Sequence, residues 1–115
     1  MAIRTDSDLM RDLPAGVYGR LLSAASSVSP IAVYVFGSYA RGTQSADSDV
    51  DLYVVTEDGD GRRGIDNAIL VGDGLLDMPI AVDVLSSHRS EFARRSRSVN
   101  AVEGRVTREG VLIGA

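Results

Sequence analysis

Residues 31–56 read IAVYVFGSYARGTQSADSDVDLYVVT, two apolar segments joined by a polar one. Segment 31–36 is a continuous run rich in β-branched and aromatic residues, which predicts a buried strand. In segment 49–56 apolar and polar residues alternate with a period of two, as expected for a strand with one buried face. Residues 37–48 are rich in Gly, Ser and Thr, which predicts a loop with a helical turn around residues 39–41.

The flanking sequence alternates between helical and strand patterns. We expect, in chain order, a helix from Pro14 to Ala25, a helix over 65–77, a strand over 80–85, a helix over 86–97, a helical face at Val99, Val102 and Val106 that stops at Gly110, and a short edge strand over 111–113. Residues 1–12 are polar and acidic without a sustained period, so we expect an N-terminal arm, loose or with a short helical turn. Residues 13–115 then form a single α/β (α+β) domain, a mixed β-sheet flanked by helices.

The composition excludes several kinds of chemistry. The chain of 115 residues has no cysteine, which rules out disulfides, thiolate metal sites and cysteine nucleophiles. All 12 basic residues are arginine, so a lysine Schiff base and the Lys-dependent phosphate loop are excluded. His88 is the only histidine, which rules out a multi-histidine metal site within one chain. The chemistry must therefore rest on carboxylates, hydroxyls, backbone groups and arginine.

Charge and hydropathy restrict the partners. A net charge of −4 makes nucleic acid an improbable partner, because affinity for nucleic acid normally rests on many cations that face phosphates. No stretch approaches the roughly 20 apolar residues that span a bilayer. The chain begins without an apolar leader segment. We therefore expect a cytoplasmic protein without a membrane partner.

Three aspartates form the candidate catalytic and metal site. Asp49 and Asp51 are two residues apart at the start of a strand, so their carboxylates project to the same face about 6.5 Å apart. Asp83 interrupts another apolar strand, where an unpaired charge is costly unless a partner or a metal compensates for it. If the two strands are neighbours, the three carboxylates can hold two Mg²⁺ ions, which prefer oxygen ligands and phosphates. A salt bridge from Asp83 to an arginine is the alternative interpretation.

The preceding loop supplies candidate nucleotide-binding residues. Gly37 and Ser38 follow directly after a strand, where exposed backbone N–H groups and a hydroxyl can contact a polyphosphate. Arg41 can add a bidentate phosphate contact, although a surface role is an equally good explanation for it.

This combination of residues resembles the DNA polymerase beta superfamily of nucleotidyltransferases. In particular, Gly-Ser-Tyr-Ala-Arg-Gly (37–42) followed by Ser-Asp-Val-Asp-Leu (48–52) is similar to the minimal nucleotidyltransferases of the antitoxin type. The resemblance implies a palm-like sheet and the transfer of a nucleoside monophosphate, most often AMP, from an NTP such as ATP to an acceptor hydroxyl. By the same resemblance Gly37 and Ser38 grip phosphates, Asp49 and Asp51 hold both Mg²⁺ ions, and Asp83 completes the second metal site and activates the acceptor.

The resemblance also implies a protein partner. Many members act beside a toxin with a higher-eukaryote-and-prokaryote nucleotide-binding (HEPN) domain, and some adenylylate a tyrosine of that toxin, so a homo- or hetero-oligomer is expected. Two alternatives remain open at this point. One is a binding module that neutralises the toxin without catalysis, and the other is a small-molecule nucleotidyltransferase of the aminoglycoside-modifying kind.

Overall fold

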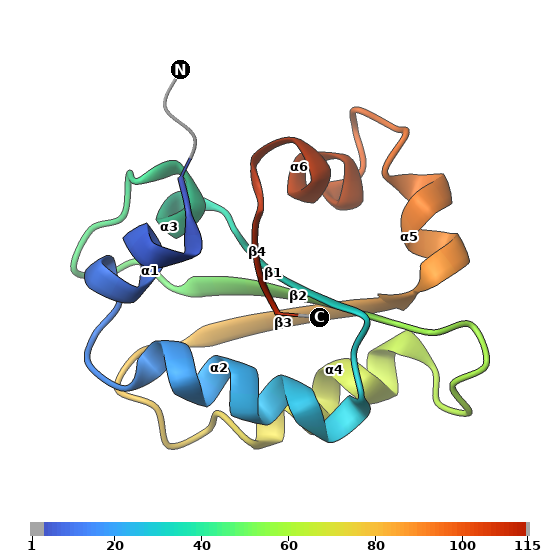
Figure 1. The fold of residues 1–115 in the computed structure, drawn as a ribbon, viewed down its shortest axis with the longest axis horizontal. Helices are drawn as coiled ribbons and strands as arrows, with labels where there is room; N and C mark the ends of the chain where they lie inside the picture. Colours follow the sequence, from blue (N-terminus) through green and yellow to red (C-terminus); the bar gives the residue numbers. More distant parts are fainter. Residues whose placement is uncertain (1–3, 115) are drawn as a thin grey trace.

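A computed structural model describes residues 4–114, and its centre is one mixed four-stranded sheet (Figure 1). The strands are β1 (Ala32–Phe36), β2 (Val50–Thr56), β3 (Val82–His88) and β4 (Val111–Gly114), and their order across the sheet is β3-β2-β1-β4. β1 pairs antiparallel with both β2 and β4, whereas β2 and β3 are parallel. The sheet is therefore mixed, as the sequence predicts, and β4 lies at one edge as expected.

Helices cover both faces of this sheet. They are α1 (Asp6–Asp12), α2 (Val17–Ala25), the 3₁₀ turn η1 (Ser26–Val28), α3 (Ser38–Arg41), α4 (Gly64–Asp73), α5 (Arg89–Arg95) and α6 (Val102–Glu109). Figure 1 shows α2 and α4 below the sheet, α5 and α6 above it, and α1 with α3 at one end. The helices between residues 4 and 114 are all too short or too polar to span a membrane, and the longest, α4, has ten residues.

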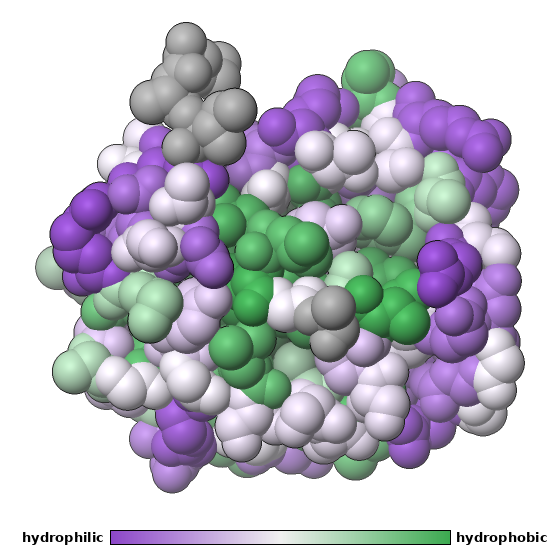
Figure 2. All heavy atoms as spheres, viewed as in Figure 1, coloured by the Kyte–Doolittle hydropathy of each residue, from purple (hydrophilic) through white to green (hydrophobic). Residues whose placement is uncertain are grey.

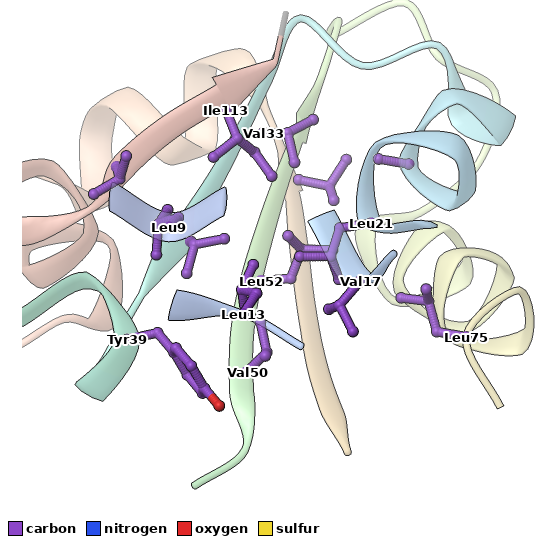
Figure 3. Packing of buried hydrophobic residues seen from close by; sticks show 14 of the residues in the cluster. Leu9, Leu13, Val17, Leu21, Val33, Tyr39, Val50, Leu52, Leu75 and Ile113 are labelled. Atoms are coloured by element: carbon purple, nitrogen blue, oxygen red, sulfur yellow. The ribbon is translucent and has the colours of Figure 1, made fainter. Parts of the chain in front are cut away.

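The main core lies between the sheet and helices α1, α2 and α4. The alternation in β2 places Val50, Leu52 and Val54 on this face, and all three are fully buried. Figure 3 shows side chains from α1, α2 and β2, among them Leu9, Leu21 and Leu52, directed into the same space. This core fixes β2, and Asp51, Tyr53 and Val55 project from the opposite face of the same strand.

A smaller core covers only part of that opposite face. Its buried members are Phe36, Tyr53, Val55 and Val106, which pack beneath α5 and α6. Along β2 the buried residues of this core end at Tyr53, and Asp51, one pleat earlier, is only half-buried. The face of the sheet that holds the aspartates is thus partly open.

The N-terminal segment differs from the expected arm. Residues 6–12 form helix α1, in which Thr5 caps the helix and Asp8 bonds back to the Thr5 backbone. Leu9 on this helix is 0% exposed and belongs to the main core. The segment is packed against the domain because Leu9, the buried residue of a mostly polar helix, reaches that core.

The bounds of four other elements also differ from the sequence pattern. The first long helix begins at Val17 rather than at Pro14, because Gly16 adopts a left-handed conformation with φ +82°. The helix predicted over 65–77 ends at Asp73, and turns follow it.

Strand β3 runs two residues later than predicted at its start and extends to His88, where a helix was expected. Parallel pairing with β2 continues to the Thr56–His88 pair, and the Tyr53 hydroxyl lies 2.7 Å from the Ser87 hydroxyl. These tertiary contacts keep Ser87 in the strand, so α5 begins only at Arg89, with His88 as its N-cap.

Candidate functional site

The turn after β1 brings the chain backbone against a carboxylate. Gly37 has φ +74°, a conformation that side chains disfavour. A Cβ atom placed on Gly37 would lie 2.1 Å from Oδ2 of Asp51. Glycine is therefore required at this position by both the backbone conformation and the close approach of Asp51.

The sheet register brings two of the predicted aspartates together. Asp51 on β2 lies directly opposite Asp83 on β3, and these strands are parallel neighbours. Neighbouring strands are about 4.8 Å apart, and opposed residues project to the same face. Asp49 lies just before β2 and is exposed. The three aspartates predicted from the sequence therefore lie at one end of the β2–β3 pair.

The pKa of Asp51 reflects this arrangement. Burial raises the pKa of Asp51 most, and the negative charges of Asp83 and Asp49 raise it further. The guanidinium groups of Arg105 and Arg41 act in the opposite direction on the same pKa, with Arg105 having the larger effect. Asp51 is thus a carboxylate whose charge is opposed by its surroundings, and a bound cation would relieve that opposition.

The carboxylates of the site are suitable ligands for Mg²⁺, although they are not arranged as a preformed metal site. Among residues 4–114, no three Asp, Glu, His or Cys side chains form a ready-made metal-binding cluster. Asp49 and Asp83 are exposed, so their side chains are free to rotate toward a cation beside Asp51. Carboxylate oxygens from adjacent strands are the ligands that Mg²⁺ prefers together with substrate phosphates.

One premise about Asp83 is wrong. The sequence suggested a charge inside an apolar strand, but β3 is an edge strand and Asp83 is exposed to solvent. Its neighbours Val82 and Val84 face the main core, which explains the apolar pattern around it. No salt bridge involving Asp83 occurs in the part of the chain that the structure describes. Asp83 therefore lies opposite Asp51 because of the register of the two strands, and no salt bridge holds it there.

Ser38 and Arg41 both belong to the short helix α3. Ser38 is half-buried, and its backbone carbonyl accepts a hydrogen bond from the Thr43 N–H at 2.9 Å. Over residues 4–114 the Ser38 hydroxyl makes no hydrogen bond, so it is available to a ligand. Arg41 forms an ion pair with Glu109 of α6 at 2.9 Å, which ties α3 to α6. Arg41 is still 43% exposed and keeps further N–H donors.

Sequence reasoning missed Arg105. This residue is exposed on α6, and its charge acts on Asp51. Arg105 is distant from the motif along the chain, and an arginine on a short polar helix carries no pattern that separates it from surface charge. Only the packing of α6 over the sheet lets this charge act on the pKa of Asp51.

A cavity of about 400 Å³ lies away from these residues. Its lining comes from the end of α4 and the segment that leads into β3: Gly72, Leu75, Leu76, Met78, Pro79, Ile80, Ala81 and Val82. Val82 faces the main core, whereas Asp83 projects to the opposite face of the sheet. This cavity and the aspartates therefore lie on opposite faces of the sheet.

Solved structures of other proteins share this fold. A protein from Sulfolobus solfataricus assigned as a nucleotidyltransferase is 23% identical, with a TM-score of 0.58 over 93% of this chain and 83% of that chain. A structure described as a toxin–antitoxin with AMP-PNP is 22% identical, with a TM-score of 0.53 over 85% of this chain and 73% of that chain. At these identities the likeness shows the fold.

The sequence comparisons are more specific. No curated protein matches the chain. The nucleotidyltransferase domain family matches residues 20–107, which include the glycine–serine turn and all three aspartates. This match confirms the resemblance seen in the sequence, and the chain belongs to the nucleotidyltransferase domain family.

Proposed function

We propose that the chain transfers AMP from ATP, or the corresponding monophosphate from another NTP, to an acceptor hydroxyl. The observation that carries this proposal is the pairing of Asp51 with Asp83 on parallel strands, with Gly37 against Asp51. The acceptor oxygen forms a bond to the α-phosphorus, and the bond from that phosphorus to the β-phosphate oxygen breaks. Pyrophosphate leaves with the electron pair, and the hydroxyl proton passes to Asp83 or to water.

The proposed site residues form two groups, one that contacts the phosphates and one that binds the metal ions. Gly37 leaves room at the turn for a phosphate, and the Ser38 hydroxyl and Arg41 donate hydrogen bonds to phosphate oxygens. Asp49, Asp51 and Asp83 are the proposed ligands of two Mg²⁺ ions. When bound, these ions would neutralise phosphate charge and lower the pKa of the attacking hydroxyl. Asp83 is at the exposed edge, where an acceptor can approach it.

The proposed acceptor is a tyrosine of a HEPN-type partner toxin, which gives the chain an antitoxin role. A structural neighbour described as a toxin–antitoxin with AMP-PNP supports this choice. The surface supports a protein partner as well, because Ile65, Ile69 and Leu70 of α4 are 59%, 55% and 43% exposed. Exposed apolar groups of this kind are typical of interaction sites. An NTP substrate is in keeping with the cytoplasmic location expected from the sequence.

The test is a transfer assay with an NTP labelled on the α-phosphate. The chain is incubated with Mg²⁺, each of the four NTPs and the polypeptide encoded beside it, and pyrophosphate release and the mass of the partner are measured. We expect one nucleotide on the partner, lost in the double variant Asp49→Ala/Asp51→Ala. Asp47→Ala, an exposed aspartate of the same loop, is the matched control and should retain transfer. Failure of the wild-type chain to bind any Mg–NTP would overturn the proposal.

A non-catalytic toxin-neutralising module is the second candidate, favoured by the exposed side chains of α4. The same double variant separates the two functions. If it still binds and neutralises the partner as well as the wild type does, binding is the biological role and transfer is dispensable.

A further inference from the structure

The helix α6 carries four charged residues, and two of them are already engaged. Glu103 bonds to the Tyr53 hydroxyl at 2.7 Å and to Arg95 at 3.0 Å. Glu109 bonds to Arg41 at 2.9 Å. Within residues 4–114 the guanidinium of Arg105 has neither an ion pair nor a hydrogen bond, which leaves its donors free.

The packing of α6 determines where these free donors lie. Val106 is fully buried in the small core with Phe36 and Tyr53. Phe36 is opposite Asp51 in the sheet, and Tyr53 is the next residue on the same face of β2. Arg105 therefore sits beside the core residue that anchors α6 next to Asp51.

The spacing of residues along α6 indicates which way Arg105 faces. Arg105 and Glu109 are four residues apart and therefore lie on the same side of α6. Glu109 reaches Arg41 of α3, the helix that follows Gly37. The side of α6 that carries Arg105 thus faces the turn and the aspartates. The guanidinium of Arg105 lowers the pKa of Asp51 more than that of Arg41 does, which agrees with this placement.

Arg108 on the same helix has a different environment. Its Nη1 atom lies over Gly104, 3.2 Å from the position that a Cβ would take there. Gly104 faces the carbonyl of Ser98 in the loop after α5. Arg108 is consequently a matched control, an exposed arginine of α6 whose guanidinium lies over Gly104 of the same helix.

We propose that Arg105 binds the phosphate group of the NTP that lies at Asp51, as a phosphate-binding residue that completes the site from above the sheet. This inference rests on the proposed nucleotidyl transfer. The planar guanidinium can donate two parallel hydrogen bonds to phosphate oxygens, and a cation there offsets the negative charge that the three aspartates direct at the substrate. Arg41 is held by Glu109, whereas Arg105 is unengaged and can turn to the ligand.

The experiment measures Mg–ATP affinity by calorimetry and pyrophosphate release for the wild type, Arg105→Ala, Arg105→Lys and Arg108→Ala, with the other three NTPs if ATP does not bind. We expect Arg105→Ala to weaken Mg–NTP binding or slow release by about 10- to 100-fold, the range for a hydrogen bond between charged groups. Arg105→Lys should recover part of the loss because it keeps the charge but not the fork. Arg108→Ala should match the wild type.

The possible results separate this inference from the function on which it rests. If the wild type binds Mg–NTP and Arg105→Ala is indistinguishable from Arg108→Ala, the role of Arg105 is wrong and nucleotidyl transfer stands. If the wild type binds no Mg–NTP, both are overturned. A fall in melting temperature that accompanies the loss in Arg105→Ala, without rescue by lysine, would indicate a structural role instead.

Discussion

Asp51 combines a position in the candidate site with an electrostatic cost. It is half-buried against the Gly37 backbone, and burial together with Asp83 raises its pKa. A carboxyl with a raised pKa in the folded state destabilises that state once it ionises. The proposed metal site needs Asp51 to be ionised, and this ionisation lowers the stability of the folded state.

Replacing Asp51 with asparagine should uncouple stability from activity. We expect Asp51→Asn to lower transfer by about 100-fold or more, since a metal contributes several kcal/mol at such a site. The same variant should have a slightly higher melting temperature at neutral pH, because a disfavoured charge is removed. Below the ordinary Asp pKa of 3.8 the advantage should vanish, and it should grow as pH rises through the raised pKa. Thermal melts over pH measure this difference, and a variant less stable than the wild type at neutral pH would contradict it.

Gly37 offers a sharper test, because Gly16 provides a matched control. Both glycines have positive φ, +74° and +82°, but a Cβ on Gly16 would meet nothing within 4 Å. The backbone conformation alone should make alanine cost about 1–2 kcal/mol of folding free energy at Gly16, which is left-handed, and up to about 3 kcal/mol at Gly37, whose ψ is −151°. Only Gly37→Ala should also displace Asp51 and reduce transfer, by about 100-fold for a shift near 1 Å. Denaturant melts and the pyrophosphate assay distinguish the two effects, and equal activity of the two variants would show that the close approach is unimportant.

Among the secondary-structure elements, β1, β2 and the turn at α3 were predictable because their signals are local. A run of β-branched residues and a period of two are properties of a few adjacent positions. The extent of β3 was not predictable, since Ser86, Ser87 and His88 show no strand pattern. They remain in the strand because of pairing with β2 and the contact between Tyr53 and Ser87.

Helix α1 shows the same limit and supplies a prediction. Its sequence is mostly polar, so the burial of Leu9 depends on a core assembled by distant residues. We expect Leu9→Ala to lower the free energy of unfolding by about 2–5 kcal/mol, as for other fully buried leucines. Met10→Ala, at a neighbouring residue that is 58% exposed, should change it by less than about 0.5 kcal/mol. Urea melts measure both, and similar values for the two variants would mean that α1 is dispensable.

The charge of the whole molecule opposes its proposed substrate. A net charge of −4 and three aspartates at the site both repel an NTP. Apolar side chains gather at the centre of the face in Figure 2, around β4, where Leu112 is 53% exposed, and hydrophilic residues border them. Affinity for the nucleotide must therefore come from local groups and a bound cation rather than from the overall field.

Removal of the metal should accordingly abolish nucleotide binding. We expect chelation of Mg²⁺ to weaken ATP binding by about 100-fold or more, because the aspartates then face the phosphates without compensation. Mn²⁺ should restore binding, since it shares the preference for oxygen ligands. Calorimetry with and without chelator checks this. Unchanged affinity without a divalent ion would argue that the arginines alone hold the nucleotide.

The candidate site could be proposed from the sequence only where a motif identifies it. Gly37, Ser38, Asp49 and Asp51 lie in one short stretch, and their spacing suggested their chemistry. The solvent-exposed edge position of Asp83 and the presence of Arg105 both depend on how β3 and α6 pack. Packing of this kind leaves no short-range trace in the sequence.

The parallel pairing of β2 with β3 has a consequence for biosynthesis. Antiparallel neighbours such as β1 and β2 can meet as soon as their connecting loop is made, but β3 must wait for the crossover through α4. A nascent chain therefore carries Asp49 and Asp51 before the strand that bears Asp83 has left the ribosome. The proposed three-aspartate site can therefore form only after the crossover is complete.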